Sequence, residues 1–343
     1  NIMKKLRVAV IGCGRIGCGF DDNNFSKKAL THAGSYQKNQ NTILNAFCDI
    51  DKLKLEKYGK KYNIDKLFKS TNEMFDNSEL DLISICTRTN SHLKLVEKIS
   101  KTNIKGIFLE KPISDNINDA KKIIKICKSK NIQLIIDHQR RFDPFFHELK
   151  KIIQIGKIGN IQLVNIFYGA GIANTGTHVF DLLRYLFGDA KYLKGHFSNN
   201  KSPNSLDPNI DVEIEFKQKI IVKMSAVNVS NYGILEMDIL GMKGRIKINL
   251  TTNETSFYKI SKKGLVYKQL EEIKIKFKAS KYSPIMLGLQ NLVDCVEKKE
   301  KPLCSGEDGL KSLELTIASI ISAKNKKTIS FPLKNNNFKI KSR

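Results

Sequence analysis

The stretch that decides the fold is Leu6-Arg7-Val8-Ala9-Val10-Ile11-Gly12-Cys13-Gly14-Arg15-Ile16-Gly17. Its first half is a short apolar run typical of a buried strand, and its second half is a Gly-x-Gly-x-x-Gly turn. In such a turn the first glycine allows a tight bend, the second lets the backbone approach a pyrophosphate, and the third allows close helix–strand packing. The N–H groups at the start of the following helix hold the phosphates. We therefore expect a dinucleotide-binding loop, with cofactor-binding residues Gly12, Gly14, Arg15, Ile16 and Gly17.

Four further apolar runs follow this strand, at residues 43–48, 82–86, 107–109 and 132–136. Amphipathic helical patterns separate them. Strands that are buried on both faces and alternate with helices are typical of a parallel sheet covered on both sides. The sequence therefore predicts an α/β Rossmann domain, built on a doubly wound parallel sheet, over residues 1–137.

The pattern changes in the second part of the chain, where strand-like runs follow one another with few helices between them. Several of these runs alternate apolar and polar residues, which predicts an antiparallel sheet with one solvated face. The predicted strands are residues 161–168, 210–217, 220–229, 234–240 and 244–250, and the predicted helices are 177–187 and 307–324. We expect an α+β C-terminal domain over residues 138–343.

An acidic residue should end the second strand and bind the ribose of the cofactor. Cys48-Asp49-Ile50-Asp51 lies there, and Asp49 directly follows the apolar run. A carboxylate at this point bonds the ribose hydroxyls of NAD and repels a 2′-phosphate, so we expect NAD rather than NADP. The alternative is that Asp49 or Asp51 caps the next helix, and the two interpretations can hold for different residues.

The spacing from Gly17 to Asp49 is 32 residues, longer than the usual interval of about 20. The excess lies around residues 18–30, a segment that contains Gly19, Asp21, Asp22, Asn23 and Asn24. Such an insertion leaves the sheet near the mouth of the cofactor site. It is either a lid over the site or an inert surface loop.

A lysine follows the fourth apolar run in Glu110-Lys111-Pro112. Ligands of open α/β sheets bind outside the carboxyl ends of the strands, so a lysine in this place would face the nicotinamide. The alternative is an ordinary surface lysine, since the chain has 51 lysines.

The formal net charge of +25 raises the question of a nucleic-acid partner. Only 8 of the 59 basic residues are arginines, and the lysines are scattered along the chain. Base and phosphate recognition favours the bidentate arginine fork. We interpret the charge as solvated lysine faces and expect no nucleic-acid partner, although a steering field for an anionic substrate would also fit.

Membrane insertion and metal binding are not indicated by the sequence. No apolar run approaches the length of about 20 residues that a bilayer requires. The seven cysteines form no Cys-x-x-Cys pair and lie mostly in apolar runs, so we expect buried thiols and no metal site. The first residues lead directly into a strand without a signal-type apolar segment, and we expect a cytoplasmic protein.

These features resemble, in combination, the Gfo/Idh/MocA (glucose–fructose oxidoreductase / inositol dehydrogenase) family. The matching motifs occur in order as Gly12–Gly17, Cys48-Asp49, Thr87 to His92, Glu110-Lys111-Pro112, Arg140-Arg141-Phe142-Asp143-Pro144, Gly176-Thr177-His178-Val179-Phe180-Asp181, Gly241 to Gly244 and Glu307-Asp308-Gly309. The resemblance implies a Rossmann domain and a C-terminal domain with a large, mostly antiparallel sheet. It also implies NAD(P)-dependent redox chemistry on sugar or cyclitol hydroxyls, and a homo-oligomer, a dimer or tetramer, formed through that sheet.

The resemblance also implies roles for single residues. Lys111 matches the active-site lysine, His178 the catalytic histidine and Asp181 a substrate-contacting aspartate. Because His178 and Asp181 are three residues apart, they lie on one face of a helix. Further cofactor-binding positions that the resemblance implies are Thr87, His92 and Glu110.

The chain departs from the family pattern at two positions. Many members carry Asp four residues before the histidine, where this chain has Asn174, which cannot accept a proton. Arg88 replaces the usual proline after Thr87. We expect Asn174, Arg88 and Arg141 to contact substrate. The alternative for Asn174 is a proton relay that differs from the family's, and the alternative for Arg141 is a structural ion pair.

The sequence thus predicts reversible hydride transfer between nicotinamide and a ring hydroxyl or ketone of a sugar, sugar nucleotide or cyclitol. His178 would be the general base and Lys111 the donor to the substrate oxygen. The basic residues favour an anionic substrate. The alternatives are an enzyme that holds NAD tightly and runs an internal redox cycle, and a non-catalytic NAD-binding regulator.

Overall fold

The computed structural model describes residues 5–23, 28–262, 264, 266–277, 279–334 and 337–341. The chain divides into two compact units. The first holds Asn1–Asp143 with Ser280–Leu310, and the second holds Pro144–Ala279 with Lys311–Arg343. The sequence pattern predicted a single division after residue 137, whereas Ser280–Leu310 returns to the first unit because its helix packs on the first sheet.

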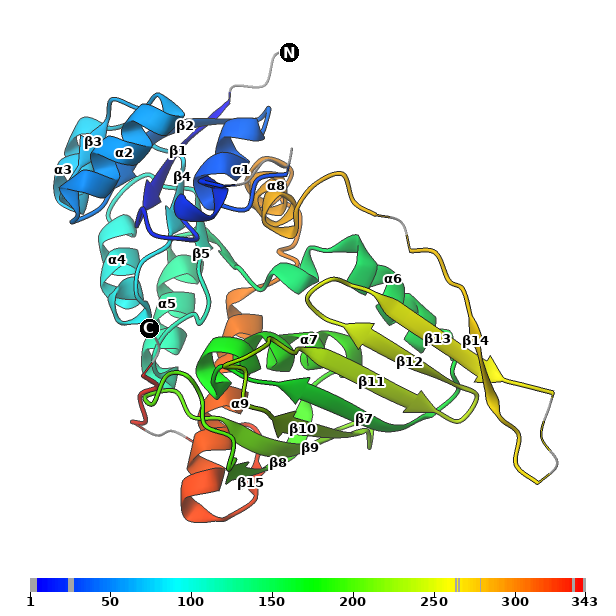
Figure 1. Ribbon diagram of the computed structural model, residues 1–343. Helices are drawn as coiled ribbons and strands as arrows, with labels where there is room; N and C mark the ends of the chain where they lie inside the picture. Colours follow the sequence, from blue (N-terminus) through cyan, green and yellow to red (C-terminus); the bar gives the residue numbers. More distant parts are fainter. Residues whose placement is uncertain are drawn as a thin grey trace. The chain divides into compact units, whose positions relative to one another are not determined.

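The first unit is built on a six-stranded parallel sheet of order β3-β2-β1-β4-β5-β6 (Figure 1). Its strands are β1 (Leu6–Ile11), β2 (Thr42–Cys48), β3 (Leu67–Phe68), β4 (Leu82–Ile85), β5 (Gly106–Leu109) and β6 (Gln133–Ile136). Every residue of β4 and β5 is buried, as expected of strands covered on both faces. The predicted doubly wound sheet is confirmed.

Helices cover this sheet, and the last of them comes from the returning segment. The helices are α1 (His32–Lys38), α2 (Lys52–Tyr62), α3 (Thr71–Asn77), α4 (His92–Ile99), α5 (Ile117–Ser129) and α8 (Pro284–Glu297). Helix α8 packs beside α1 and against β5 and β6 (Figure 1). Gly106 leaves room for it, because a Cβ there would lie 2.9 Å from the Leu292 side chain.

The insertion after the glycine loop interrupts a helix without breaking its hydrogen bonds. The N–H of His32 donates to the carbonyl of Ile16 at 3.1 Å, and the N–H of Ala33 donates to that of Gly17 at 2.9 Å. Helix α1 therefore supplies the helical partners of Ile16 and Gly17, while the first inserted residues donate to the carbonyls of Gly14 and Arg15. An insertion placed this way leaves the loop and the sheet in register.

The described part of the insertion is anchored on α2. Asp22 forms ion pairs with Lys57 and Lys61 at 2.6 and 2.9 Å, and the Tyr58 hydroxyl donates to it at 3.0 Å. Partial burial acts to raise the pKa of Asp22, but these bonds outweigh it and lower the pKa to about 2. Gly19, Asp21 and Asn23 are described with it, whereas Asn24 lies outside the described residues.

The second unit is built on a nine-stranded sheet of order β14-β13-β12-β11-β7-β10-β9-β8-β15. Its strands are β7 (Ile161–Tyr168), β8 (Ala190–Phe197), β9 (Ile210–Phe216), β10 (Ile221–Ala226), β11 (Glu236–Gly241), β12 (Gly244–Asn249), β13 (Thr255–Ile260), β14 (Leu270–Ile273) and β15 (Ile329–Ser330). All neighbours are antiparallel except β7 and β10, which are parallel. The α+β prediction is confirmed.

Among the described residues, the helices that accompany this sheet are α6 (Pro144–Gln154), α7 (Thr177–Phe187) and α9 (Gly306–Asn325), whose first turn belongs to the first unit. A short π-helix, η4 (Ile172–Gly176), runs directly into α7. Helix α7 has the bounds that its apolar spacing predicts, and it buries most of its side chains. Among the described residues, no helix is long and apolar enough to cross a membrane.

Candidate cofactor and active site

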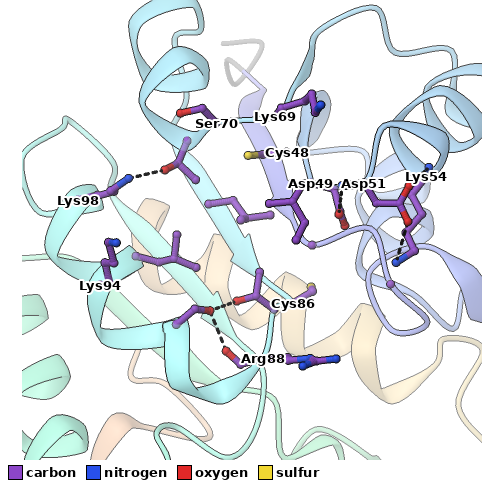
Figure 2. Close-up of a pocket in the computed structure, with 18 of the residues that line it drawn as sticks. Cys48, Asp49, Asp51, Lys54, Lys69, Ser70, Cys86, Arg88, Lys94 and Lys98 are labelled. Atoms are coloured by element: carbon purple, nitrogen blue, oxygen red, sulfur yellow. Dashed lines mark hydrogen bonds and ion pairs between the residues drawn. The ribbon is translucent and has the colours of Figure 1, made fainter. Parts of the chain in front are cut away.

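The first unit contains a cavity of about 890 Å³ at the carboxyl edge of its sheet (Figure 2). It is lined by Gly12 and Gly14 of the glycine loop, by Asp49 after β2, and by Thr87 and Arg88 after β4. These five positions were all predicted from the sequence. The cavity therefore occupies the place where open α/β sheets bind their ligands.

The three glycines of the loop have the geometry that their predicted roles require. Gly12 has a φ of +98°, and a Cβ there would lie 2.7 Å from the Cys86 carbonyl group. A Cβ on Gly17 would lie 2.0 Å from the Gly12 carbonyl oxygen. A Cβ on Gly14 would have no neighbour within 4 Å, so the backbone at Gly14 is open to the cavity. Gly12 and Gly17 thus shape the loop, and Gly14 leaves room for a ligand.

Asp51 caps the helix after β2, and the Asp49 carboxylate bonds to the glycine loop instead. Oδ2 of Asp49 accepts from the N–H of Cys13 at 2.6 Å, and Oδ1 accepts from the N–H of Asp51 at 2.9 Å. Asp51 is the N-cap of α2 and accepts from Leu53 and Lys54. The Asp49 carboxylate is therefore fixed beside the glycine loop, and its remaining lone pairs can accept further hydrogen bonds.

Four lysines also line the cavity, and none of them was predicted as a site residue. They are Lys54, Lys69, Lys94 and Lys98. Figure 2 shows Lys94 and Lys98 on one wall and Lys54 beside Asp51 on the other. Lys94 and Lys98 are four residues apart on α4, a spacing that places both on one helix face. The sequence contains this spacing, but nothing in it distinguishes these two lysines from the many others.

Arg88 follows β4 and lines the cavity as an exposed side chain. Its carbonyl accepts from the Ser91 hydroxyl at 2.8 Å, and that hydroxyl lies 2.6 Å from Thr87 Oγ1. Within the described residues, no carboxylate lies at ion-pairing distance from its guanidinium. The charge of Arg88 is thus available to an anionic ligand in the cavity.

The Glu110-Lys111-Pro112 turn directly follows β5, so Lys111 lies at the carboxyl edge of the sheet. The N–H of Glu110 donates to the Ile85 carbonyl at 3.0 Å, and the Lys111–Pro112 peptide bond is cis. Lys111 is half-buried and Glu110 is buried. Neither side chain lines the cavity of the first unit.

His92 is buried below this turn. Its Nδ1 lies 3.1 Å from the Ile113 carbonyl oxygen, and its Nε2 lies 3.3 Å from that of Thr87. Burial lowers the pKa of His92, although these carbonyl groups oppose the effect. The geometry makes His92 a brace between the two loops that follow β4 and β5, and the structure does not bring it to the cavity. Arg15, Ile16 and Gly17 also lie outside the cavity lining.

Arg141 pairs with a carboxylate of its own unit. Its guanidinium lies 3.1 Å from Oδ1 of Asp308, and its side chain is 8% exposed. A structural ion pair, the alternative to substrate contact for Arg141, has this geometry.

In the second unit, His178 and Asp181 lie in the first two turns of α7. His178 is half-buried and Asp181 is 1% exposed. Asn174 lies in the π-helix before them and is exposed, with its amide donating to the Ala170 carbonyl at 3.3 Å. The N-terminal part of this helical segment therefore holds all three residues that the sequence assigned to substrate in this unit.

A tripeptide from a distant loop caps this segment. Asp207-Pro208-Asn209 accepts from four consecutive backbone N–H groups. Gly171 donates to Asn209 Oδ1, and Ile172 donates to the Pro208 carbonyl. Ala173 and Asn174 donate to the two carboxylate oxygens of Asp207. The four bonds are 2.8 to 3.0 Å long. Helix N-termini leave four such groups unsatisfied. Asp207 is thus a positioning residue for the segment that carries His178.

Comparisons with known proteins agree with these features. Residues 6–138 match the family model described as "Oxidoreductase family, NAD-binding Rossmann fold", and residues 169–331 match its "C-terminal alpha/beta domain". The chain belongs to the Gfo/Idh/MocA oxidoreductase family. It is 25% identical to myo-inositol 2-dehydrogenase of Thermotoga maritima, over 94% of this chain and 98% of that protein. It is 24% identical to scyllo-inositol 2-dehydrogenase (NAD(+)) of Bacillus subtilis, over 96% of this chain and 97% of that protein.

Solved structures share the fold at lower identity. The WlbA dehydrogenase from Bordetella pertussis, in complex with NADH and UDP-GlcNAcA, matches with a TM-score of 0.78 and 19% identity, over 96% of this chain and all of that chain. Membership makes the first unit an NAD-binding domain and the protein an oxidoreductase. The residues present fit NAD, because Gly14 opens to the cavity and Asp49 has free lone pairs beside the glycine loop.

Two glycine substitutions separate cofactor contact from loop packing. Gly14→Ala should weaken NADH binding about 10- to 100-fold, because an added methyl group in a packed contact costs about 1–3 kcal/mol, while the free energy of unfolding stays the same. Gly17→Ala should lower the free energy of unfolding by about 1–3 kcal/mol, because its Cβ overlaps the Gly12 carbonyl. NADH fluorescence titration and urea denaturation measure the two effects. A loss of stability in Gly14→Ala would contradict this assignment.

The cap on the His178 segment can be tested in the same way. Asp207→Ala should lower the free energy of unfolding of the second unit by about 1–2 kcal/mol, the usual cost of a lost helix cap. Asn204→Ala in the same loop removes a local bond to the Leu206 N–H and is the control. If both variants unfold at the same urea concentration as the parent protein, Asp207 does not hold the segment.

Proposed function

We propose that the protein catalyses reversible hydride transfer between nicotinamide and a ring hydroxyl of a sugar, sugar nucleotide or cyclitol. The observation that carries this proposal is the lysine directly after β5 at the carboxyl edge of an NAD-binding sheet, in a family whose relatives are named as inositol and apiose dehydrogenases. NAD, when bound, supplies the hydride acceptor. The Asp49 carboxylate favours NAD over NADP because it repels a 2′-phosphate.

In this proposal His178 accepts the proton that leaves the substrate hydroxyl, and Lys111 stabilises the negative charge on the substrate oxygen. His178 takes the hydroxyl proton as general base, since an imidazole titrates near neutral pH. Lys111 donates a hydrogen bond to the substrate oxygen and stabilises its negative charge. Asp181 and Asn174 orient neighbouring hydroxyls. The proposal requires Lys111 of the first unit and His178 of the second to reach one substrate.

We further propose that the substrate carries a negative charge. Arg88 follows β4 and lines the cavity with no carboxylate at pairing distance among the described residues. A sugar acid or a sugar nucleotide would satisfy this charge. The complex of the WlbA dehydrogenase with UDP-GlcNAcA gives one related protein that binds such a molecule.

Two other functions remain as alternatives. An enzyme that holds NAD tightly and regenerates it internally would retain the cofactor through gel filtration, and one structural neighbour is an aldose-aldose oxidoreductase. A regulator would bind NADH and turn over no substrate. A screen of NAD⁺ reduction with inositols, neutral sugars, sugar acids and sugar nucleotides separates the three.

Lys111→Met should lower kcat at least about 100-fold and leave NADH binding nearly unchanged. The matched control is Lys105→Met, since Lys105 lies just before β5, at the opposite edge of the sheet, and pairs with Asp81 at 3.1 Å. Steady-state kinetics and NADH titration measure both. A loss of NADH affinity with unchanged kcat would show that Lys111 belongs to the cofactor site.

Arg88→Gln tests the charge of the substrate. Loss of a hydrogen bond to a charged group costs about 1.5–3 kcal/mol, so KM for a sugar acid or sugar nucleotide should rise about 10- to 100-fold. The neutral sugar of the same stereochemistry is the control, and its KM should not change. Equal changes for both substrates would assign Arg88 to another role.

A further inference from the structure

A buried group of titratable side chains lies behind Lys111, and the proposed reaction does not use it. His32 of α1 lies between Glu110, the residue before Lys111, and Asp137, the residue after β6. Its Nε2 is 3.0 Å from Oε1 of Glu110 and 3.6 Å from Oδ2 of Asp137. His32 and Asp137 are fully buried, and the Glu110 side chain is 12% exposed. We call these three residues the buried triad.

The second ring nitrogen of His32 fixes the orientation of the imidazole. Nδ1 lies 2.8 Å from the Ser84 hydroxyl on β4, which in turn lies 2.9 Å from the Tyr36 hydroxyl. The Phe108 ring packs against the imidazole, with 4.8 Å between centroids. The ring is therefore held on three sides, and only one edge points at the two carboxyl groups.

The protonation of the buried triad follows from its neighbours. Burial acts to lower the pKa of His32, but Cys86, Asp137 and Glu110 outweigh it and raise the pKa well above its ordinary value. This direction favours the imidazolium form, in which both ring nitrogens donate. Burial and the charge of Asp137 raise the pKa of Glu110 to about 7, against the bond from His32. Burial also acts on Asp137, but the bonds from His32 and Glu110 keep its pKa below the ordinary value.

His32 also contacts the glycine loop through its backbone, since its N–H donates to the Ile16 carbonyl at 3.1 Å. One residue thus bonds the cofactor loop with its main chain and the lysine turn with its side chain. Glu110 is the residue through which the lysine turn joins the buried triad. A shift of the Glu110 carboxyl would therefore move Lys111, its neighbour in the chain.

We propose that the buried triad is a positioning device that holds Lys111 at a fixed place relative to the glycine loop, with His32, Glu110 and Asp137 as positioning residues for the proposed reaction. This inference rests on the proposed role of Lys111. The triad places one cation between two carboxyl groups at the ends of adjacent strands, so the turn is held by charge as well as by backbone bonds. A change in any of the three partners leaves the turn held by its backbone bonds alone.

The three residues also offer ligand atoms within 4.8 Å of one another, as a metal site would. The contact of 3.0 Å between Nε2 and Oε1 of Glu110 is a hydrogen-bond distance, and a proton shared between the two atoms occupies the lone pair that a metal would use. The raised pKa of His32 agrees with the protonated form. We therefore assign the contacts to hydrogen bonds, and the experiment includes a chelator to test this.

The experiment compares His32→Gln, Glu110→Gln and Asp137→Asn with the control Thr42→Val. The control removes a buried hydrogen bond, from the Thr42 hydroxyl to the Tyr36 carbonyl at 2.8 Å, which is not part of the His32 network. The three triad variants should lower kcat about 10- to 100-fold, as expected when a reacting group is displaced by about 1 Å. Their NADH affinity should change little, because the backbone bond to Ile16 remains. Thr42→Val should lose thermal stability and keep kcat.

The pH profile gives a readout that a purely structural role would not move. The titratable groups that face Glu110 are His32 from α1, Asp137 after β6 and Cys86 after β4. Because the Glu110 pKa is raised to about 7, its carboxyl is neutral below that pH and charged above it. The proposed general base His178 contributes its own inflection in every variant, so the readout is the difference between two profiles. The kcat profiles of the parent protein and of Thr42→Val should contain a further inflection near this pH, and the profile of Glu110→Gln should not.

A chemical readout separates this inference from the proposed function. Acetic anhydride labels the Lys111 amine, and peptide mass spectrometry compares the labelling rate with that of Lys105. This rate depends on the environment of the Lys111 amine and needs no substrate. The labelling rate should change in the three triad variants and not in Thr42→Val. If the parent protein turns over no substrate, the proposed function fails, while the labelling still supports or overturns the positioning role.

Three results would overturn the inference. The first is wild-type kcat and wild-type Lys111 labelling in His32→Gln and Glu110→Gln. The second is a loss of kcat in all four variants that follows their loss of stability. The third is a loss of activity on dialysis against EDTA that zinc restores, which would make the triad a metal site.

Discussion

The hydrogen-bond ladder of the parallel sheet continues one residue past the ends of its strands, and the candidate site depends on this continuation. The bonds, at 2.8 to 3.0 Å, run from Gly12 N to Cys48 O, from Cys86 N to Ile11 O, from Glu110 N to Ile85 O and from Asp137 N to Leu109 O. The first residue after each of these strands is therefore as fixed as the strand itself. Loops usually carry functional residues on a rigid scaffold, and here the scaffold extends into the first loop position.

This constraint explains how the chain carries an insertion next to its cofactor loop. The carbonyl groups of Ile16 and Gly17 need helical partners, and His32 and Ala33 supply them after the inserted residues. The insertion then has its own anchor, because Asp22 pairs with two lysines of α2. Neither the loop nor the sheet has to adjust. Of the two interpretations of this segment, the anchored geometry of the described residues agrees with a surface loop fixed to α2.

Local chemistry was predictable from the sequence, and long-range pairing was not. The glycine loop imposes its own backbone geometry, so the spacing of Gly12, Gly14 and Gly17 was enough to assign their roles. The cap by Asp207 joins positions 34 residues apart, and nothing in the loop sequence marks its partner. Strand β14 was missed because its residues are mostly exposed and show no alternation. Periodicity reports burial, and an edge strand without a buried face carries no such signal.

His32 shows the same limit at the candidate site. It lies 78 residues from Glu110 in the chain, and the inserted residues separate it from the glycine loop to which its backbone belongs. Sequence spacing alone therefore hides both of its contacts.

The energetic cost of the buried triad argues for a role beyond stability. Two carboxyl groups and an imidazole lose their hydration in the core, and in measured cases replacing buried ion pairs with apolar side chains of similar volume is often neutral or stabilising. An apolar cluster under β4, β5 and β6 would serve the fold as well. An apolar cluster, however, has no directional bonds and would not fix the Glu110 carboxyl to a single point. Directional bonds from a held imidazole do so, and a hydride-transfer site that depends on the position of Lys111 needs that precision more than it needs the added stability.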